Sequence, residues 1–391
     1  MKRTHVILSL LAIVALGCAR PEFNPNPVGE SDSIADTIQL TRGFERAGEA
    51  YFSRDMSWII FQAVPKGEKQ YQMFVAPLMY DVSESAPAPG TVVRATPLPG
   101  ITIPHATDII RIGDPVRISP SVSRNTCGWF SPDGNSILFA STAGKEKPEE
   151  PSSGYQREGR DYRWSFPEGM EIFRADGWQG AIAAADPGSI VDLAKHAITN
   201  NAAYDAECSF SPDGKWIVFT SMMTGDGELY AMRADGSNVV QLTKTPGYDG
   251  GAFFSPDGKR LVYRSDRKKD NLLQIFVADV VRDPQGNITG LANEHQLTHE
   301  QHVHWCPFWH PDGEHIVYST DRDTTDKEHP NYDLYLMRDD GTLKTRVTTF
   351  EAGDVLPAFS PDGKYLMWAS KRTPDGTTQV FVAKFEFPKG S

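Results

Sequence analysis

The stretch "FSPDGKWIVFTS", residues 210–221, recurs in near copies along the chain. In each copy an aromatic residue ends one segment, Ser-Pro-Asp-Gly follows, and alternating apolar residues begin the next segment. Proline presets its own φ, aspartate bonds nearby backbone N–H groups, and glycine tolerates positive φ, so these four residues predict a tight reversal. Each copy therefore predicts a β-hairpin.

The hairpin is one part of a longer repeat. The other copies are "FSRDMSWIIFQA" at 52–63, "FSPDGNSILFAS" at 130–141, "FSPDGKRLVYRS" at 254–265, "WHPDGEHIVYST" at 309–320 and "FSPDGKYLMWAS" at 359–370. A third apolar segment follows each copy, as in "ELYAMRADG" at 228–236. A fourth, shorter segment that ends in Thr or Ser follows five of them, as in "VQLT" at 240–243.

The count of fourth segments predicts how the repeat closes. The last copy has no fourth segment after residues 379–385, whereas "IQLT" at 38–41 stands before the first copy. If the N-terminal segment completes the last set, six sets of four strands form a closed ring, and closure removes the exposed sheet edges of an open stack. The sequence predicts an all-β, six-bladed β-propeller with four antiparallel strands per blade.

The Ser-Pro-Asp-Gly turn resembles the TolB-like, WD40-like class of propeller repeat. The resemblance extends over nearly all of residues 34–391, the expected propeller domain, and it implies the fold. TolB itself, a periplasmic partner of Tol envelope proteins, carries an α/β domain before its propeller. Only a short tether precedes Ile38 here, so the resemblance does not imply the role of TolB.

The N-terminal residues predict export. Lys2 and Arg3 precede an apolar run at residues 6–16, which is too short to span a bilayer and is typical of a signal peptide, here residues 1–17. The following "ALGC" resembles a bacterial lipobox and implies lipidation of Cys18, with simple secretion as the alternative. Residues 18–33 are rich in Pro and Asn and predict a flexible tether. We expect an outer-membrane lipoprotein that faces the periplasm or the cell surface and touches the membrane only through its lipid.

Charge and cysteine content narrow the expected partners. The formal net charge of -12 argues against nucleic acid as a partner, because binding the phosphate backbone needs a basic face. If Cys18 is lipidated, Cys127, Cys208 and Cys306 remain, an odd number that leaves at least one free thiol in the expected monomer. All three are expected to be buried.

Two of the blades carry long insertions. Successive turn aspartates, from Asp55 through Asp133, Asp213, Asp257 and Asp312 to Asp362, are separated by 78, 80, 44, 55 and 50 residues. A blade needs about 40–50 residues, so the first two intervals predict extra segments near 82–113, 144–168 and 177–193. Loops of this length are functional or disordered, and recognition of a partner is one interpretation.

Polar residues recur before the turns. Counting back from each turn aspartate, position minus eight holds Asp205, Asp249, His304 and Asp354, and position minus six holds Glu49 and Glu207 among others. Side chains on an extended strand alternate, so these positions should share one side at the channel mouth. A ring of carboxylates would favour a cation, a basic ligand group or raised pKa values, whereas an ordinary solvated rim would only bond neighbouring loops. The candidate rim residues are Glu49, Asn125, Asp205, Glu207, Asp249, His302, His304 and Asp354.

The segment "HVHWCPFWHPDG" adds a candidate for metal binding. His302 and His304 lie about 7 Å apart on one face of an extended strand, where two imidazoles can bind one ion. A divalent cation held by this pair with the acidic rim is therefore a hypothesis. Trp309 and His310, in contrast, belong to the repeated packing and turn positions.

These observations favour a non-enzymatic envelope scaffold that binds a protein, peptide or glycan through the channel rim and the long loops. The alternative is a metal-dependent lyase or hydrolase that acts on acidic sugars at the channel mouth, with His302, His304, Asp205 and Asp249 as ligands. No Gly-x-Ser-x-Gly elbow, Walker loop or dinucleotide fingerprint occurs in the sequence. No catalytic residue is predicted.

Overall fold

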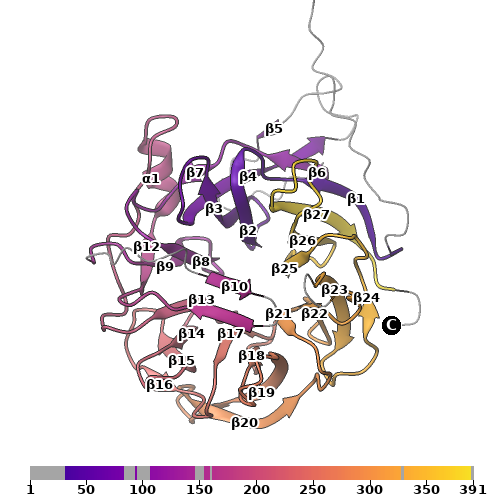
Figure 1. Ribbon diagram of the computed structural model, residues 1–391. Helices are drawn as coiled ribbons and strands as arrows, with labels where there is room; N and C mark the ends of the chain where they lie inside the picture. Colours follow the sequence, from indigo (N-terminus) through magenta and orange to yellow (C-terminus); the bar gives the residue numbers. More distant parts are fainter. Residues whose placement is uncertain are drawn as a thin grey trace, which may run out of the picture.

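A computed structural model describes residues 31–82, 93–94, 106–145, 154–158, 161–326 and 330–388. Within these residues, six antiparallel sheets surround a central axis, as the blades of a propeller do (Figure 1). The predicted all-β, six-bladed architecture is confirmed. Cys18, the leader and most of the tether lie outside the described residues, as do parts of the first two insertions. No helix among the described residues is long and apolar enough to cross a membrane.

Each blade runs outward from an inner strand. Blade one consists of β2 (Phe44–Phe52), β3 (Trp58–Pro65), β4 (Gln72–Val82) and β7 (Val116–Arg117). Blade two consists of β8 (Asn125–Phe130), β9 (Ser136–Ser141) and β12 (Glu171–Asp176). Blade three consists of β13 (Asp205–Phe210), β14 (Trp216–Ser221), β15 (Glu228–Arg233) and β16 (Val240–Gln241).

The second half of the chain repeats this order. Blade four consists of β17 (Asp249–Phe254), β18 (Arg260–Ser265), β19 (Gln274–Arg282) and β20 (Ile288–Gln296). Blade five consists of β21 (His304–Trp309), β22 (His315–Thr320), β23 (Asp333–Arg338) and β24 (Thr345–Arg346). Blade six consists of β25 (Asp354–Phe359), β26 (Tyr365–Ser370), β27 (Gln379–Phe385) and the N-terminal strand β1 (Ile34–Gln39).

The N-terminal strand closes the ring, as its sequence predicts. β1 is antiparallel to β27, with Ile38 opposite Val382 (Figure 1). Just beyond the strand, the Thr41 hydroxyl accepts the Val380 N–H at 2.8 Å and donates to the Gln379 amide oxygen at 2.9 Å. A buried Ser or Thr hydroxyl accepts the corresponding N–H in the other five blades, at Ser119, Thr199, Thr243, Thr298 and Thr348. This bond explains why every fourth segment ends in Thr or Ser.

The repeated turn is held by its own side chains. In blade three the Ser211 hydroxyl donates to Asp213 at 2.6 Å and accepts the Trp216 N–H at 3.0 Å. Gly214 has a φ of 69°, which an L residue adopts only at a cost. In blade five, where His310 replaces the serine, Asp312 accepts from the His315 ring nitrogen at 2.8 Å instead.

Aromatic side chains fill the seams between blades. The residue three before each turn aspartate is buried in every blade: Phe52, Phe130, Phe210, Phe254, Trp309 and Phe359. Trp309 of blade five, for example, packs with Val262 of blade four. The described cysteines, Cys127, Cys208 and Cys306, are buried and free, as expected.

The insertions attach to blades one and two. In blade one, β4 continues outward and pairs with β5 (Val93–Arg94) and β6 (Ala106–Ile112). Blade two carries a hairpin of β10 (Gly154–Glu158) and β11 (Asp161–Ser165), and the short helix α1 (Trp178–Ala184). Its fourth position is reduced to a single bridge between Phe173 and Ala197. The segment after α1 runs along blade one, where the Val191 N–H donates to the Arg117 carbonyl at 2.9 Å.

Candidate functional site

A β-bulge occurs at the same position in all six inner strands. The residue six before each turn aspartate has a left-handed φ between 44° and 60°, and the strand register shifts around it. These residues are Glu49, Cys127, Glu207, Gly251, Cys306 and Leu356. Because a bulge adds one residue without a partner, it reverses the alternation of side chains that follows. The bulge directs all six positions into the channel.

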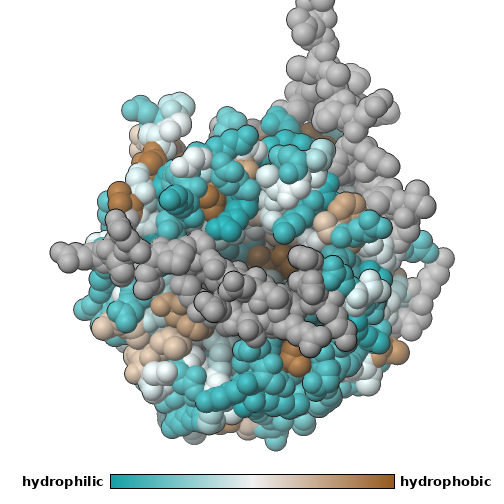
Figure 2. Space-filling view, in the orientation of Figure 1, coloured by the Kyte–Doolittle hydropathy of each residue, from teal (hydrophilic) through white to brown (hydrophobic). Residues whose placement is uncertain are grey.

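The bulge residues line a cavity of about 740 Å³ at one end of the channel. Its wall includes residues of every inner strand, so no single blade forms it. Figure 2 shows apolar surface inside the hollow at the ring centre and mainly hydrophilic surface around it. Ligand pockets commonly have volumes of about 300–1,000 Å³ and combine apolar walls with a few placed polar groups.

Aromatic rings from four blades meet below the cavity, where Tyr51 and Phe253 line its floor and pack against Trp129 and Phe308. Tyr51, Trp129, Phe253 and Phe308 stand four residues before their turn aspartates and meet on the axis. The centroids of Tyr51 and Trp129 lie 4.6 Å apart, and those of Phe253 and Phe308 lie 5.1 Å apart. Ring pairs across the two groups are also in contact, at 5.3 Å between Trp129 and Phe253. The channel is therefore blind at this depth.

Glu207 and Arg264 form a buried ion pair above this floor. The Arg264 guanidinium contacts one oxygen of Glu207 at 2.6 Å. The other oxygen accepts from the Tyr248 hydroxyl at 2.5 Å, the Thr220 hydroxyl at 2.7 Å and the Gly251 N–H at 2.8 Å. Gly251 is required here, because a Cβ at this position would lie 1.7 Å from Arg264 Nη1. Both oxygens of Glu207 are bonded, so the pair is a structural charge pair within the cavity wall.

Glu49 is the second carboxyl group in the cavity, and its bonding is weaker. The Thr126 hydroxyl donates to it at 3.3 Å, and among the described residues no Lys, Arg or His forms an ion pair with it. Burial, with the charge of Glu207 as a smaller cause, raises the pKa of Glu49 to about 7. The side chain is therefore partly protonated at neutral pH.

Loops complete the wall at the mouth. Phe166, at the end of the blade-two insertion, packs on Tyr204 and Tyr248 with ring centroids 5.1 and 5.8 Å away. Trp305 contacts Tyr332 across the opposite side at 6.5 Å. Charged residues at the mouth include Arg46, Glu351 and Lys371. An aromatic wall with both signs of charge at its edge suits an amphipathic ligand.

Most of the predicted rim residues at position minus eight do not line the cavity. Asp205, Asp249, His304 and Asp354 are fully buried and are absent from the lining among the described residues. The expectation that positions minus six and minus eight share a side was wrong, because the bulge begins at position minus six itself and turns that side chain away from the direction of its neighbour at minus eight. Glu49 and Glu207 do line the cavity. Asn125 also lies in the wall, where it accepts from the Ser141 hydroxyl at 2.7 Å.

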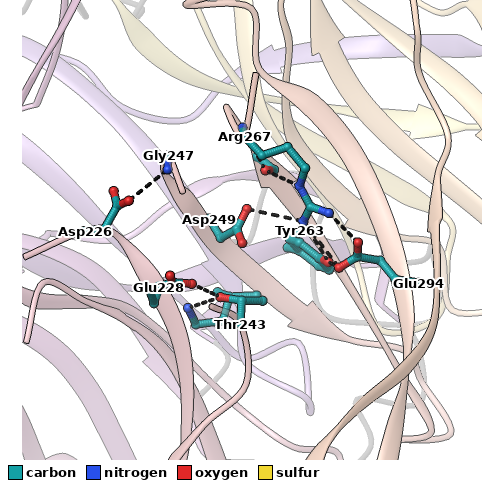
Figure 3. A network of polar contacts seen from close by, with 10 residues as sticks. Asp226, Glu228, Thr243, Gly247, Asp249, Tyr263, Arg267 and Glu294 are labelled. Carbon is teal, nitrogen blue, oxygen red and sulfur yellow. Dashed lines mark hydrogen bonds and ion pairs between the residues drawn. The ribbon is translucent and has the colours of Figure 1, made fainter. Parts of the chain in front are cut away.

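The buried acids at position minus eight instead connect strands and loops of their own blade. Asp205 accepts from the Ser221 hydroxyl at 2.5 Å, and Asp354 from the Arg372 guanidinium at 2.7 Å. Figure 3 shows the corresponding network in blade four, where Arg267 lies between Asp249, at 3.4 Å, and Glu294. These contacts hold the loops that surround the mouth.

The two histidines of the metal hypothesis contact different acids. His302 Nδ1 lies 3.5 Å from Asp321 Oδ1, whereas His304 Nε2 lies 3.4 Å from Glu300 Oε2. Burial lowers the pKa of His304 to about 3, so its ring is neutral. Among the described residues, no group of three or more His, Cys, Asp or Glu side chains is placed to hold a metal ion.

Comparisons with known proteins agree with this architecture. Residues 189–289 match the family model of the TolB beta propeller domain. The chain is 28% identical over 170 residues to a "Protein TolB homolog" of Chlorobium luteolum, a match that covers 43% of this chain and 34% of that relative. The chain is a β-propeller that resembles the TolB propeller.

Solved structures similar to this TolB-like propeller share its fold at low identity. A β-propeller domain of Cps50 (Swd1) from Myceliophteria thermophila superposes with a TM-score of 0.50 and 11% identity, over 90% of this chain and 99% of that one. A putative TolB from Agrobacterium tumefaciens gives a TM-score of 0.48 and 16% identity, over 87% and 91% of the two chains. The curated TolB homologue is matched over only about a third of its length.

Sequence reasoning missed Arg264 and the aromatic wall of this TolB-like propeller. Arg264 stands seven residues after its turn aspartate, where the other copies have small or uncharged residues: Gln62, Ala140, Thr220, Ser319 and Ala369. A lone arginine in that row is a signal that comparison of the copies would have found. Phe166 and Tyr332 lie in loops outside the repeat, so no internal comparison points to them.

Proposed function

We propose that this TolB-like propeller is a non-enzymatic binding scaffold of the cell envelope, which holds a segment of a partner protein in the cavity at its channel mouth. The observation that supports the proposal most directly is the blind cavity of about 740 Å³. Residues from all six blades and from the blade-two insertion line it. Such a site takes a short stretch of polypeptide rather than a flat protein surface.

The chemistry of the wall supports binding rather than catalysis. Glu207 is held by an arginine, two hydroxyl groups and a backbone N–H, an arrangement that fixes the carboxylate. The thiols of Cys127 and Cys306 face the cavity, but burial raises the pKa of each well above its ordinary value, which keeps them protonated. A protonated thiol is a poor nucleophile. For the metal-dependent alternative, the described residues contain no group of three or more His, Cys, Asp or Glu side chains that could hold a metal ion.

The leader and the family support the location. Lys2, Arg3 and the apolar run at 6–16 are typical of exported chains, and "ALGC" suggests lipidation at Cys18. The match to the TolB propeller family is consistent with an envelope protein that binds another protein. We therefore place the scaffold at the outer membrane as a lipoprotein.

Site-specific photo-crosslinking in intact cells tests the proposal. A photoreactive amino acid replaces Phe166 in the cavity wall and, in a matched control, Val239, which is half exposed on the outside of blade three. We expect one envelope protein to be captured from position 166 and not from position 239. Equal capture at both positions, or none at position 166, would contradict binding through the cavity.

The purified partner then allows a direct measurement of affinity. Replacing Phe166 with alanine removes one aromatic side of the wall, which we expect to weaken binding by about tenfold, since buried aromatic contacts at binding sites commonly contribute more than 1 kcal/mol. Unchanged affinity would place the partner elsewhere on the protein. The metal hypothesis is tested by elemental analysis, which compares the bound metal of the native protein with that of a His302→Ala, His304→Ala double variant.

A further inference from the structure

The ionisable groups of the cavity differ in how they are neutralised. Glu207 and Arg264 are paired at 2.6 Å, and the Arg264 guanidinium also donates to the Tyr248 hydroxyl at 2.8 Å. At the mouth, Arg46 lies over the Tyr71 ring, with its guanidinium carbon 4.7 Å from the centroid. Glu49 has no such cation among the described residues. Among the described residues, its hydrogen-bond partners are the Thr126 hydroxyl, at 3.3 Å, and the Cys127 side chain, and neither carries a positive charge.

Counting charges at the floor gives one uncompensated acid. The Glu207 and Arg264 charges cancel, so an ionised Glu49 leaves the bottom of the cavity with one net negative charge. Arg264 cannot swing to Glu49 without leaving Glu207 with no cation in a buried position, which is strongly unfavourable. A cation that neutralises Glu49 must therefore come from outside the described wall.

The surroundings of Glu49 favour an organic cation with an apolar stem. The Tyr51 ring lines the adjacent part of the cavity and packs against Trp129, with centroids 4.6 Å apart. Aromatic faces attract ammonium and guanidinium groups, and their apolar area packs against methylene groups. The wall above is aromatic as well, through Tyr71 and Tyr204. An anionic group would be repelled by Glu49, and a neutral group would leave it unpaired.

We propose that Glu49 is the recognition point for a basic side chain, lysine or arginine, of the partner segment that enters the cavity. This inference rests on the proposed function and specifies its ligand. The basic group lies against the floor and forms an ion pair with Glu49, while its methylene stem packs between the aromatic walls. Recognition thereby depends on one carboxylate at the bottom of a blind channel.

Binding by such a site depends on pH. The titratable and charged groups that face Glu49 come from several elements: Tyr51 on β2, Tyr71 before β4, Cys127 on β8, Tyr204 before β13, Glu207 on β13, Arg264 on β18 and Cys306 on β21. Burial raises the pKa of each of these phenols and thiols, so they stay neutral. Glu49 must lose its proton to pair with the cation, so affinity should rise with pH up to about 7 and then level off.

Small probes test the subsite on the full-length protein in detergent. The probes are N-acetyl-lysine methylamide, its arginine counterpart and the Nε-acetylated lysine derivative, which lacks the charge. Binding is followed by ligand-observed saturation-transfer NMR at pH 6, 7 and 8. We expect both basic probes to bind, the acetylated probe not to bind, and the affinity to fall several-fold from pH 7 to pH 6.

Variants assign the effect to one carboxyl group. Glu49→Gln should weaken binding of the basic probes by about 10- to 100-fold, as expected for loss of a charge-assisted bond, and should abolish the pH dependence. Glu314→Gln removes an exposed acid in the blade-five turn, which is not part of the cavity lining, and should change neither. Glu49→Asp keeps the charge but draws it back by one methylene group, so we expect it to bind the basic probes with intermediate affinity. This variant provides the test if Glu49→Gln folds poorly. Basic probes that bind Glu49→Gln as tightly as the native protein would overturn the inference.

Crosslinking separates this inference from the proposed function. Capture of the envelope partner from position 166 should fall strongly in the Glu49→Gln background and persist in Glu314→Gln. Undiminished capture in Glu49→Gln would refute the role of Glu49 and leave the scaffold function standing. Loss of capture in the native background would instead refute the scaffold function.

Discussion

Single residues in this propeller have roles that depend on one backbone angle. Glu49 and Glu207 occupy the same position of the repeat, and a left-handed φ places both in the channel. The two carboxyl groups differ in their ion pairing: Arg264 pairs with Glu207, whereas Glu49 has no ion pair with a cation among the described residues. Two carboxyl groups at equivalent positions of the repeat therefore lie in different electrostatic surroundings.

The free energy of unfolding of a Glu49→Gln variant should reveal this difference. With a pKa raised from 4.5 to about 7, native Glu49 keeps its proton where the unfolded chain has lost it, so its contribution to stability falls as pH rises from about 4.5 to 7. Relative to the native protein, Glu49→Gln should therefore gain stability across this range, by on the order of 3 kcal/mol at most. Urea unfolding at pH 5 and pH 8 measures the change. A difference that is the same at both pH values would show that Glu49 titrates normally.

At the scale of elements, the short strand β1 closes the ring of blades. It covers the edge of β27, and Ile34 and Leu40, at and just beyond its two ends, are buried. The last strand of the chain lies beside it, since the Glu386 N–H donates to the Ser33 carbonyl at 2.9 Å. The ring is thus closed by pairing between the two ends of the described chain.

A circular permutant tests whether pairing rather than chain order closes the ring. The permuted chain starts at residue 43, joins residue 388 to residue 31 through a short glycine linker, and ends at residue 42. Because β1 then follows β27 as a hairpin, we expect stability within about 1 kcal/mol of the native chain. A chain that lacks residues 31–42 altogether should lose about 4 kcal/mol or more through Ile34, Leu40 and the exposed edge of β27. Thermal unfolding and sedimentation measure both, and equal stability of the two chains would contradict closure by β1.

At the scale of the whole molecule, the floor of the cavity couples blades that are distant in sequence. Tyr51, Trp129, Phe253 and Phe308 belong to blades one, two, four and five, and their rings touch on the axis. Neighbouring blades also share buried seams. We therefore expect the ring to unfold as one cooperative unit, in contrast to open repeat proteins, in which each repeat contacts only its neighbours.

A double-mutant cycle measures the coupling across the axis. Phe253→Ala and Phe308→Ala remove two rings whose centroids lie 5.1 Å apart, so their effects on the free energy of unfolding should differ from additivity by about 0.5–1.5 kcal/mol. Phe253→Ala combined with Ile34→Ala, which lies in a separate packing cluster, should be additive within about 0.5 kcal/mol. Additivity in the first pair would show that the floor is not a unit.

Sequence by itself was sufficient for the number of blades, the strand that closes the ring, the aromatic seams and the turns. Each of these depends on local motifs that recur in order, such as Ser211 to Gly214, so counting and alignment of the copies reveal them. The same alignment put Glu49 and Glu207 at one position of the repeat, and both of these residues line the cavity. The side on which Asp205, Asp249, His304 and Asp354 point could not be read in this way, because strict alternation fails at a bulge.

Only the tertiary structure decided which groups share the cavity. Arg264 of blade four pairs with Glu207 of the neighbouring blade three, and Gly251 leaves room for the arginine. Phe166 belongs to an insertion outside the repeat. None of these contacts is local in sequence, and each depends on the curvature of a closed ring. The uncompensated charge of Glu49 has the same origin, because it depends on which cations the ring brings near and which it has already paired.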